Sequence, residues 1–128
     1  MAKAEGKYFQ FTGEDQINPD FLETFTFDGP DQYIMTETDE FSAVCPFSGL
    51  PDLAYVKIEY YPKGGKCIEL KSLKQYAFHL RDIVVSYERL INIFYDHLMQ
   101  TYEPERLRIS MICISFIYLY GLSLLYPF

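Results

Sequence analysis

The chain has 128 residues, of which 49% are hydrophobic, and this suits a single globular domain with a modest core. A formal net charge of −7 argues against binding of nucleic acid through a broad basic surface. Three cysteines without paired spacing and a polar N-terminus argue against a disulfide framework and a signal peptide. We therefore expect a cytoplasmic protein that contacts neither nucleic acid nor membrane. No metal-binding motif occurs, so no metal site is expected.

The first half of the chain is predicted to contain an arm followed by two strands. Residues 1–31 form the arm, which turn signals interrupt, and residues 32–128 form the single domain. Residues 32–38 are predicted to be a strand, and residues 42–52 an ordered loop, because two prolines and a glycine break regular structure. Residues 53–61 alternate apolar and polar side chains, as a strand with one buried face does.

A hairpin is expected next. Pro62-Lys63-Gly64-Gly65 has the composition of a tight turn. The strand Lys66–Leu70 should therefore return from this turn and pair with residues 53–61.

Two helices are predicted in the second half. Helical spacing begins near Ser72, and a second helix should run from Tyr87 to Tyr102, where Pro104 stops it. A further strand should open at residues 107–109. The order of strands and helices favours an α+β domain, with the helices on one face of an antiparallel sheet.

The last twenty residues, 109–128, contain no charged side chain. Such an apolar stretch is long enough to span a bilayer. Two buried strands are equally compatible with it, because isoleucine and tyrosine favour strands and small residues interrupt the run. A tail altered by a shift of reading frame is a third interpretation. The membrane interpretation ranks last, because nothing else in the chain indicates an anchored protein.

Cys45 and Asp52 are the first candidates for chemistry. A thiolate is a strong nucleophile toward an electrophilic carbon, and a carboxylic acid can protonate the nitrogen that gains negative charge. The alternative is a buried cysteine that acts as a small apolar group and an aspartate that caps a turn. The spacing alone favours this alternative.

Lys71 and Lys74 lie where a strand is expected to lead into a helix, and their spacing puts them on one helix face. Two ammonium groups near a helix N-terminus suit a phosphate, although a solvated basic turn explains them as well. Glu88, with Arg81 and Tyr87, is the third candidate, because a carboxylate can accept two hydrogen bonds from the amidine-like edge of a purine. An ordinary charge favoured by the helix dipole is the alternative for Glu88. His97 is expected to be exposed and is given no role.

Two of these segments resemble motifs of the 7-cyano-7-deazaguanine reductases of queuosine biosynthesis, in their short single-module form. Cys45-Pro46-x-x-Gly49-x-Pro51-Asp52 is similar to the nucleophile loop of that family, and Glu69-Leu70-Lys71-Ser72-Leu73-Lys74-x-Tyr76 is similar to its signature. The resemblance implies the tunnelling fold, in which a four-stranded antiparallel sheet carries two helices on one face. It also implies a homo-oligomeric ring with active sites at subunit interfaces.

The resemblance further implies an activity. Cys45 would attack the nitrile carbon of 7-cyano-7-deazaguanine and form a thioimide, and Asp52 would deliver the proton. NADPH would then reduce the thioimide to the aminomethyl product in two hydride transfers, with Lys71 and Lys74 at its phosphates. The implied substrate-binding residues are Ile68, Glu69, Leu70, Tyr87 and Glu88.

The chain departs from the family pattern in two places. Tyr87 stands where the family has a histidine, and a phenol with a pKa of about 10 is a poor proton shuttle at neutral pH. Residues 109–128 lack the family's Pro-Arg-Gly-Gly segment, whose arginine helps to bind NADPH. Two alternatives therefore stay open: a relative that transfers an amidine or amine instead of a hydride, and a catalytically impaired oligomer that keeps the purine pocket. The lysines argue against the first.

Overall fold

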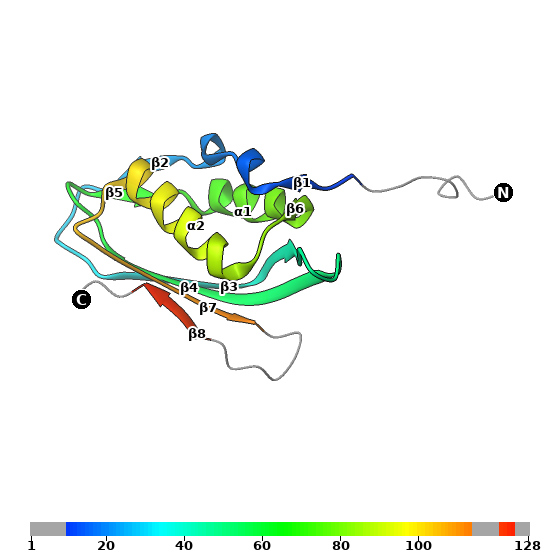
Figure 1. Ribbon diagram of the computed structural model, residues 1–128. Helices are drawn as coiled ribbons and strands as arrows, with labels where there is room; N and C mark the ends of the chain where they lie inside the picture. The colour runs from blue at the N-terminus through cyan, green and yellow to red at the C-terminus, as the bar shows by residue number, and fades with distance from the viewer. Residues whose placement is uncertain (1–9, 114–120, 125–128) are drawn as a thin grey trace.

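The computed structural model describes residues 10–113, together with the backbone of residues 121–124. The two α-helices lie over one face of a β-sheet, as Figure 1 shows. The strand order in this sheet is β1-β6-β3-β4-β7-β8, and a second small sheet pairs β2 with β5. The elements in chain order are β1 (Thr12–Gly13), η1 (Glu14–Gln16), η2 (Pro19–Phe21), β2 (Thr24–Thr26), β3 (Ile34–Val44), β4 (Pro51–Tyr61), β5 (Lys66–Ile68), α1 (Leu70–His79), η3 (Leu80–Asp82), β6 (Ile83–Val84), α2 (Tyr87–Tyr102), β7 (Arg106–Cys113) and β8 (Gly121–Leu124).

The predicted α+β class, with an antiparallel sheet and two helices on one face, is confirmed. Four strands, β3, β4, β7 and β8, pair as antiparallel neighbours. The two-residue strands β6 and β1 extend this sheet in parallel beyond β3. The predicted bounds of α2 are also confirmed, because Ser86 caps its first turn and Glu103 ends it in a left-handed conformation.

The predicted hairpin between residues 53–61 and 66–70 is wrong. β5 pairs with β2 of the arm, because β4 already has β3 on one side and β7 on the other. Gly65 makes this exchange possible: its φ is +73°, and its carbonyl accepts a hydrogen bond from the Phe27 amide at 2.8 Å. A Cβ atom at Gly65 would lie 2.1 Å from the Phe27 carbonyl oxygen, so a side chain there would push the arm away.

The arm contributes to the core as well as to the small sheet. Ile17 and Leu22 belong to the buried hydrophobic cluster, although most of residues 10–31 are exposed. The division of the chain at residue 31 stays a prediction. The loop expected at 42–52 is shorter than predicted, because β3 continues to Val44 and β4 begins at Pro51. Proline is tolerated there as the first residue of a strand.

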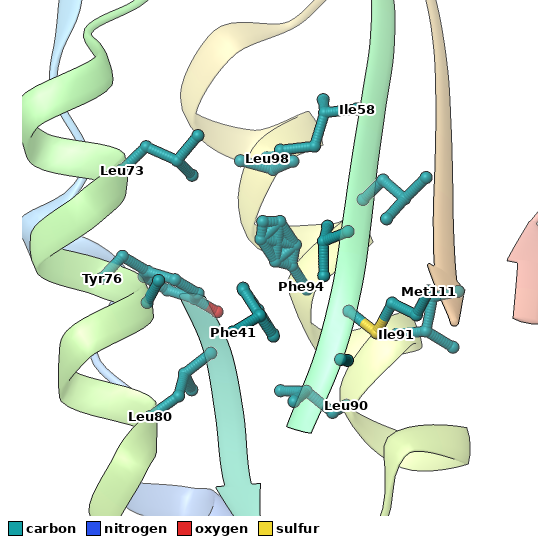
Figure 2. Packing of buried hydrophobic residues seen from close by; sticks show 14 of the residues in the cluster. Phe41, Ile58, Leu73, Tyr76, Leu80, Leu90, Ile91, Phe94, Leu98 and Met111 are labelled. Atoms are coloured by element: carbon teal, nitrogen blue, oxygen red, sulfur yellow. The ribbon is translucent and has the colours of Figure 1, made fainter. Parts of the chain in front are cut away.

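Phe94 of α2 joins both helices to the sheet. Its ring is fully buried and lies 5.3 Å from the ring centroids of Phe41 on β3 and Tyr76 on α1, in edge-to-face geometry. Figure 2 shows these rings between the helices and the sheet, with leucine and isoleucine side chains around them. His97 was expected to be exposed, but it is half-buried and its Nδ1 lies 2.8 Å from the Tyr76 hydroxyl.

The apolar C-terminal stretch supplies strands where the structure describes it. β7 pairs with β4 from Arg106 to Cys113, and β8 pairs with β7 from Gly121 to Leu124. Among the described residues, no helix is long and apolar enough to cross a membrane. Residues 114–120 and 125–128 lie outside the described part, and they make up most of the uncharged stretch 109–128.

Candidate active site

Cys45 and Asp52 are brought together by the pairing of β3 with β4. Cys45 directly follows the last residue of β3, and Asp52 is the second residue of β4, opposite Ala43. The six-residue connection is closed by two main-chain hydrogen bonds, from the Cys45 amide to the Leu50 carbonyl and from the Gly49 amide to the Cys45 carbonyl, both 2.9 Å. Gly49 has a φ of +69°, a conformation that favours glycine. The turn therefore fixes the thiol beside the carboxyl.

The surroundings of Cys45 favour its thiolate. A hydrogen bond from the Ser48 hydroxyl is the largest influence, and the main-chain amides of Phe47 and Ser48 add two more. Together they hold the pKa of the Cys45 thiol below its usual value, against the opposing effects of burial and of the Asp52 charge. Cys45 is only partly buried, so a ligand can reach it. A reactive cysteine needs both properties.

Asp52 is shifted in the opposite direction. Partial burial raises the pKa of its carboxyl most, and the negative charge of Glu88 raises it further, while a hydrogen bond with Cys45 lowers it. A raised pKa keeps a larger fraction of this carboxyl protonated near neutral pH than an ordinary aspartate would have. A nucleophile with a lowered pKa beside an acid with a raised pKa suits addition of sulfur coupled to proton delivery.

The N-terminus of α2 completes this group. Tyr87 is buried, and its hydroxyl donates a hydrogen bond to the main-chain carbonyl of Asp52. Burial raises the pKa of Tyr87, so its phenol stays protonated at neutral pH. Glu88 is exposed one residue further along the helix. Tyr87 thus positions the Asp52 strand, and Glu88 is the side chain of the pair that a ligand can reach.

Cys113, in the apolar stretch near the C-terminus, also lies near the acids of this site. It pairs with Ala54 near the start of β4, and the charges of Asp52 and Glu88 raise the pKa of its thiol after the larger effect of burial. Asp52 and Cys113 lie 61 positions apart, so only the pairing of β4 with β7 brings them near each other. The raised pKa disfavours the thiolate at Cys113, whereas the shift at Cys45 favours it.

The remaining predicted binding residues lie around the N-terminal end of α1. Glu69 caps this helix, and its carboxylate accepts hydrogen bonds from the Lys71 amide at 3.0 Å and the Ser72 amide at 2.7 Å. The Ile68 amide donates to the Tyr60 hydroxyl at 3.0 Å, and the side chain of Leu70 is exposed. Helix capping therefore occupies much of the hydrogen-bonding capacity of Glu69.

Lys71 and Lys74 suit the phosphates of a dinucleotide. Both are exposed on the outer face of α1, and Lys74 lies 3.3 Å from Glu40 in a pair whose two side chains are more than half exposed. Such a surface pair is weak and can exchange for a phosphate. The lysines also line a hollow of about 410 Å³ together with aromatic side chains. These residues fit NADPH through charge and through the room beside them.

Within one chain, the Cys45–Asp52 pair and the residues around Glu69 lie far apart. Val44, next to Cys45, pairs with Val84 of β6, and β6 follows the C-terminal end of α1. Glu69 and Lys71 lie at the N-terminal end of the same ten-residue helix, about 15 Å away along its axis. Figure 1 shows the β3–β4 turn and β5 at opposite ends of the molecule. A ligand that contacted both Cys45 and Glu69 of the same chain would therefore have to span most of the length of α1.

Comparison with known proteins places the chain in a family. The family model for QueF-like protein matches residues 51–112. The NADPH-dependent 7-cyano-7-deazaguanine reductases of Thermotoga petrophila and Thermotoga maritima are each 53% identical over 112 residues, which cover 88% of this chain and 82% of each relative. The chain belongs to the QueF-like family. The reductase of the same name from Caldanaerobacter subterraneus is 37% identical over 109 residues, covering 84% of this chain and 81% of that protein.

A solved structure places this QueF-like chain in a known fold. The crystal structure of an archaeosine synthase QueF-Like in the apo form superposes with a TM-score of 0.59, at 18% sequence identity. The match covers 75% of this chain and 91% of that one. At this identity the likeness shows the fold alone, and the expected tunnelling fold is thereby confirmed.

Proposed function

We propose that this protein reduces the nitrile of 7-cyano-7-deazaguanine to the aminomethyl group, with NADPH as reductant, in queuosine biosynthesis. The observation that carries the proposal is that the β3–β4 turn places Cys45 beside Asp52, in a chain 53% identical to reductases named for this reaction. A nitrile carbon is electrophilic, and its nitrogen becomes basic when sulfur adds to the carbon. A thiolate beside a protonated carboxyl serves both needs.

In the first step, the Cys45 sulfur forms a bond to the nitrile carbon and one π bond of the nitrile breaks. The nitrogen takes the proton of the Asp52 carboxyl, which leaves a thioimide and a carboxylate. When bound, NADPH would supply the two hydrides of the four-electron reduction, and one further proton would complete the neutral amine. The Cys45 thiolate leaves as the bond to carbon breaks. Tyr87 holds the main chain of Asp52 in place throughout, through its hydrogen bond to the carbonyl.

We place the substrate between two copies of the chain. Cys45, Asp52 and Glu88 of one subunit would face Ile68, Glu69 and Leu70 of its neighbour, because one subunit holds these groups at opposite ends of α1. β3 supports this arrangement as an edge for assembly. Within the described residues it pairs on its outer side only at Val44, so strand pairing with a second copy is open to it.

The direct test is incubation of the unaltered chain with the nitrile and NADPH. We expect loss of NADPH absorbance at two molecules per nitrile consumed, and the aminomethyl product by mass spectrometry. A stable covalent adduct without NADPH oxidation would indicate the catalytically impaired form, and transfer of an amine or amidine would indicate the alternative relative. Absence of any adduct would contradict the proposal.

The proposal assigns no role to nucleic acid or membrane, and the three unpaired cysteines support a reducing, cytoplasmic setting.

The shared site can be tested by mixing two inactive variants. Cys45→Ala and Glu69→Ala proteins should each be inactive alone, because every site then lacks one half. After dissociation and reassembly as a mixture, some interfaces combine an intact Cys45 with an intact Glu69, and roughly a quarter of the activity should return in a random mixture. A matched mixture of Cys45→Ala with Asp52→Ala should not recover activity, since both residues belong to the same half. If neither mixture recovers activity, the site lies within one chain.

A further inference from the structure

The outer face of α1 carries an aromatic side chain that the proposed chemistry leaves unused. Phe78 is 65% exposed, although it is a large apolar residue. It follows Lys71 and Lys74 at helical spacing, so the three side chains share one face of the helix. The guanidinium carbon of Arg81 lies 4.8 Å from the centroid of its ring. Arg81 therefore lies against the exposed ring, and two lysines lie along the same helix face, on a chain whose net charge is −7.

A surface hollow lies beside the Phe78 ring. It has a volume of about 410 Å³ and is lined by Phe21, Lys71, Lys74, Gln75, Phe78 and His79. The wall across from α1 comes from the arm, where the Phe21 ring lies 5.0 Å from the ring of His79. His79 is itself held, because its Nε2 lies 3.0 Å from the Gln16 carbonyl oxygen and 3.2 Å from the Asn18 amide nitrogen. The side of the hollow formed by Phe21 and His79 is therefore held by contacts between the arm and α1.

These features match one kind of ligand. A flat base stacks on aromatic rings, and phosphates attached to it pair with lysine and arginine. The space accommodates one base with its ribose, and three cations on a strongly acidic chain are too few for a polynucleotide track. Phe78 lies one to two helical turns beyond the lysines, toward the C-terminal end of α1. The order along the helix is thus phosphates first and base second.

We infer that the hollow between Phe21 and Phe78 binds the adenine end of NADPH, and that the adenine stacks on Phe78. The inference rests on the proposed function, because that function supplies NADPH as the ligand. The arm thereby takes part in cofactor binding, since it carries Phe21. Lys71 and Lys74 meet the phosphates between the two halves of the dinucleotide, and the nicotinamide half extends toward Glu69 at the start of the helix.

The test compares ligands that contain and lack the adenine. Isothermal titration calorimetry should show that Phe78→Ala weakens binding of adenosine 2′,5′-bisphosphate and of NADPH about tenfold, the usual cost of losing one base–aromatic stack. Binding of reduced nicotinamide mononucleotide, which has no adenine, should not change. Phe78→Leu should weaken the first two ligands similarly, because it keeps apolar bulk without a ring. Phe25→Ala removes another half-exposed phenylalanine, on β2 outside this hollow, and should change none of the three.

Unaltered affinity of Phe78→Ala for adenosine 2′,5′-bisphosphate would overturn the inference, and so would failure of the unaltered chain to bind this ligand. The proposed function fails in a different way. If the unaltered chain forms no adduct with the nitrile and oxidises no NADPH, the reductase assignment falls, whatever the bisphosphate titration shows. If it reduces the nitrile and Phe78→Ala keeps its affinity for both adenine ligands, only the placement of the adenine is wrong.

Discussion

Cys45→Ala should abolish covalent capture of 7-cyano-7-deazaguanine and lower NADPH oxidation by about four orders of magnitude or more, as loss of a nucleophile does in enzymes that use one. The physical reason is that no other group in the Cys45–Asp52 cluster combines access with a lowered thiol pKa. Mass spectrometry of the intact protein after incubation with the nitrile measures capture, and peptide mapping locates the adduct.

Cys113→Ala provides the matched control. Cys113 feels the charges of the same two acids, but its pKa is raised, so its removal should leave the adduct on Cys45 in full yield. An adduct on Cys113 or Cys67 in the unaltered chain would contradict the assignment. An undiminished adduct in Cys45→Ala would contradict it as well.

The pH dependence of capture should report the two shifts at this pair. Addition needs the Cys45 thiolate, whose fraction rises with pH from a lowered pKa, and the Asp52 acid, whose fraction falls only above a raised pKa. The plot of capture rate against pH should therefore be bell-shaped. A lowered thiol pKa with a raised carboxyl pKa increases the fraction of the protein that holds the Cys45 thiolate and the Asp52 acid at the same time. Asp52→Asn should lower the rate by about 10² to 10⁴ and leave a single ionisation, that of Cys45. A bell-shaped pH dependence that persists in Asp52→Asn would show that another group donates the proton.

Phe94→Ala should lower the free energy of unfolding by about 3 to 5 kcal/mol, which is a large part of the stability of a domain of this size. The fully buried ring contacts Phe41 on β3 and Tyr76 on α1, so its removal leaves a cavity where the two helices meet the sheet. Urea denaturation followed by far-ultraviolet circular dichroism measures the change. Phe25→Ala, at a half-exposed ring, should shift the same quantity by no more than about 0.5 kcal/mol. A similar small shift for Phe94→Ala would show that the core there can collapse around the missing ring.

The chemistry at Tyr87 illustrates how local sequence can mislead. From sequence, Tyr87 is a substitute for a histidine and a candidate to touch the substrate. In the structure its hydroxyl is committed to the Asp52 carbonyl, across 35 positions of chain. We therefore expect its removal to act through the position of Asp52. The contact could not be foreseen, because it depends on how α2 meets the start of β4.

The sequence by itself determined the features that arise from short-range order. The alternation at Ala54, Val56, Ile58 and Tyr60 identified the buried face of β4, since successive side chains of a strand point to opposite faces. The spacing of apolar residues and the proline beyond them located α2, because a helix repeats every 3.6 residues wherever it packs. The nucleophile loop and the lysines received their roles from a resemblance to family motifs, which are likewise made of residues close together in the chain.

Tertiary structure alone decided which of these pieces meet. A turn such as Pro62–Gly65 permits a hairpin, but hydrogen bonding to β3 and β7 occupied both edges of β4 and left β5 to pair with the arm. The pKa shifts at Asp52 and Cys113 likewise depend on burial and on charges brought near by distant segments. The separation of Cys45 from Glu69 by the length of α1 is of the same kind. Strand pairing and burial sum over the whole chain, so a local window of sequence does not contain them.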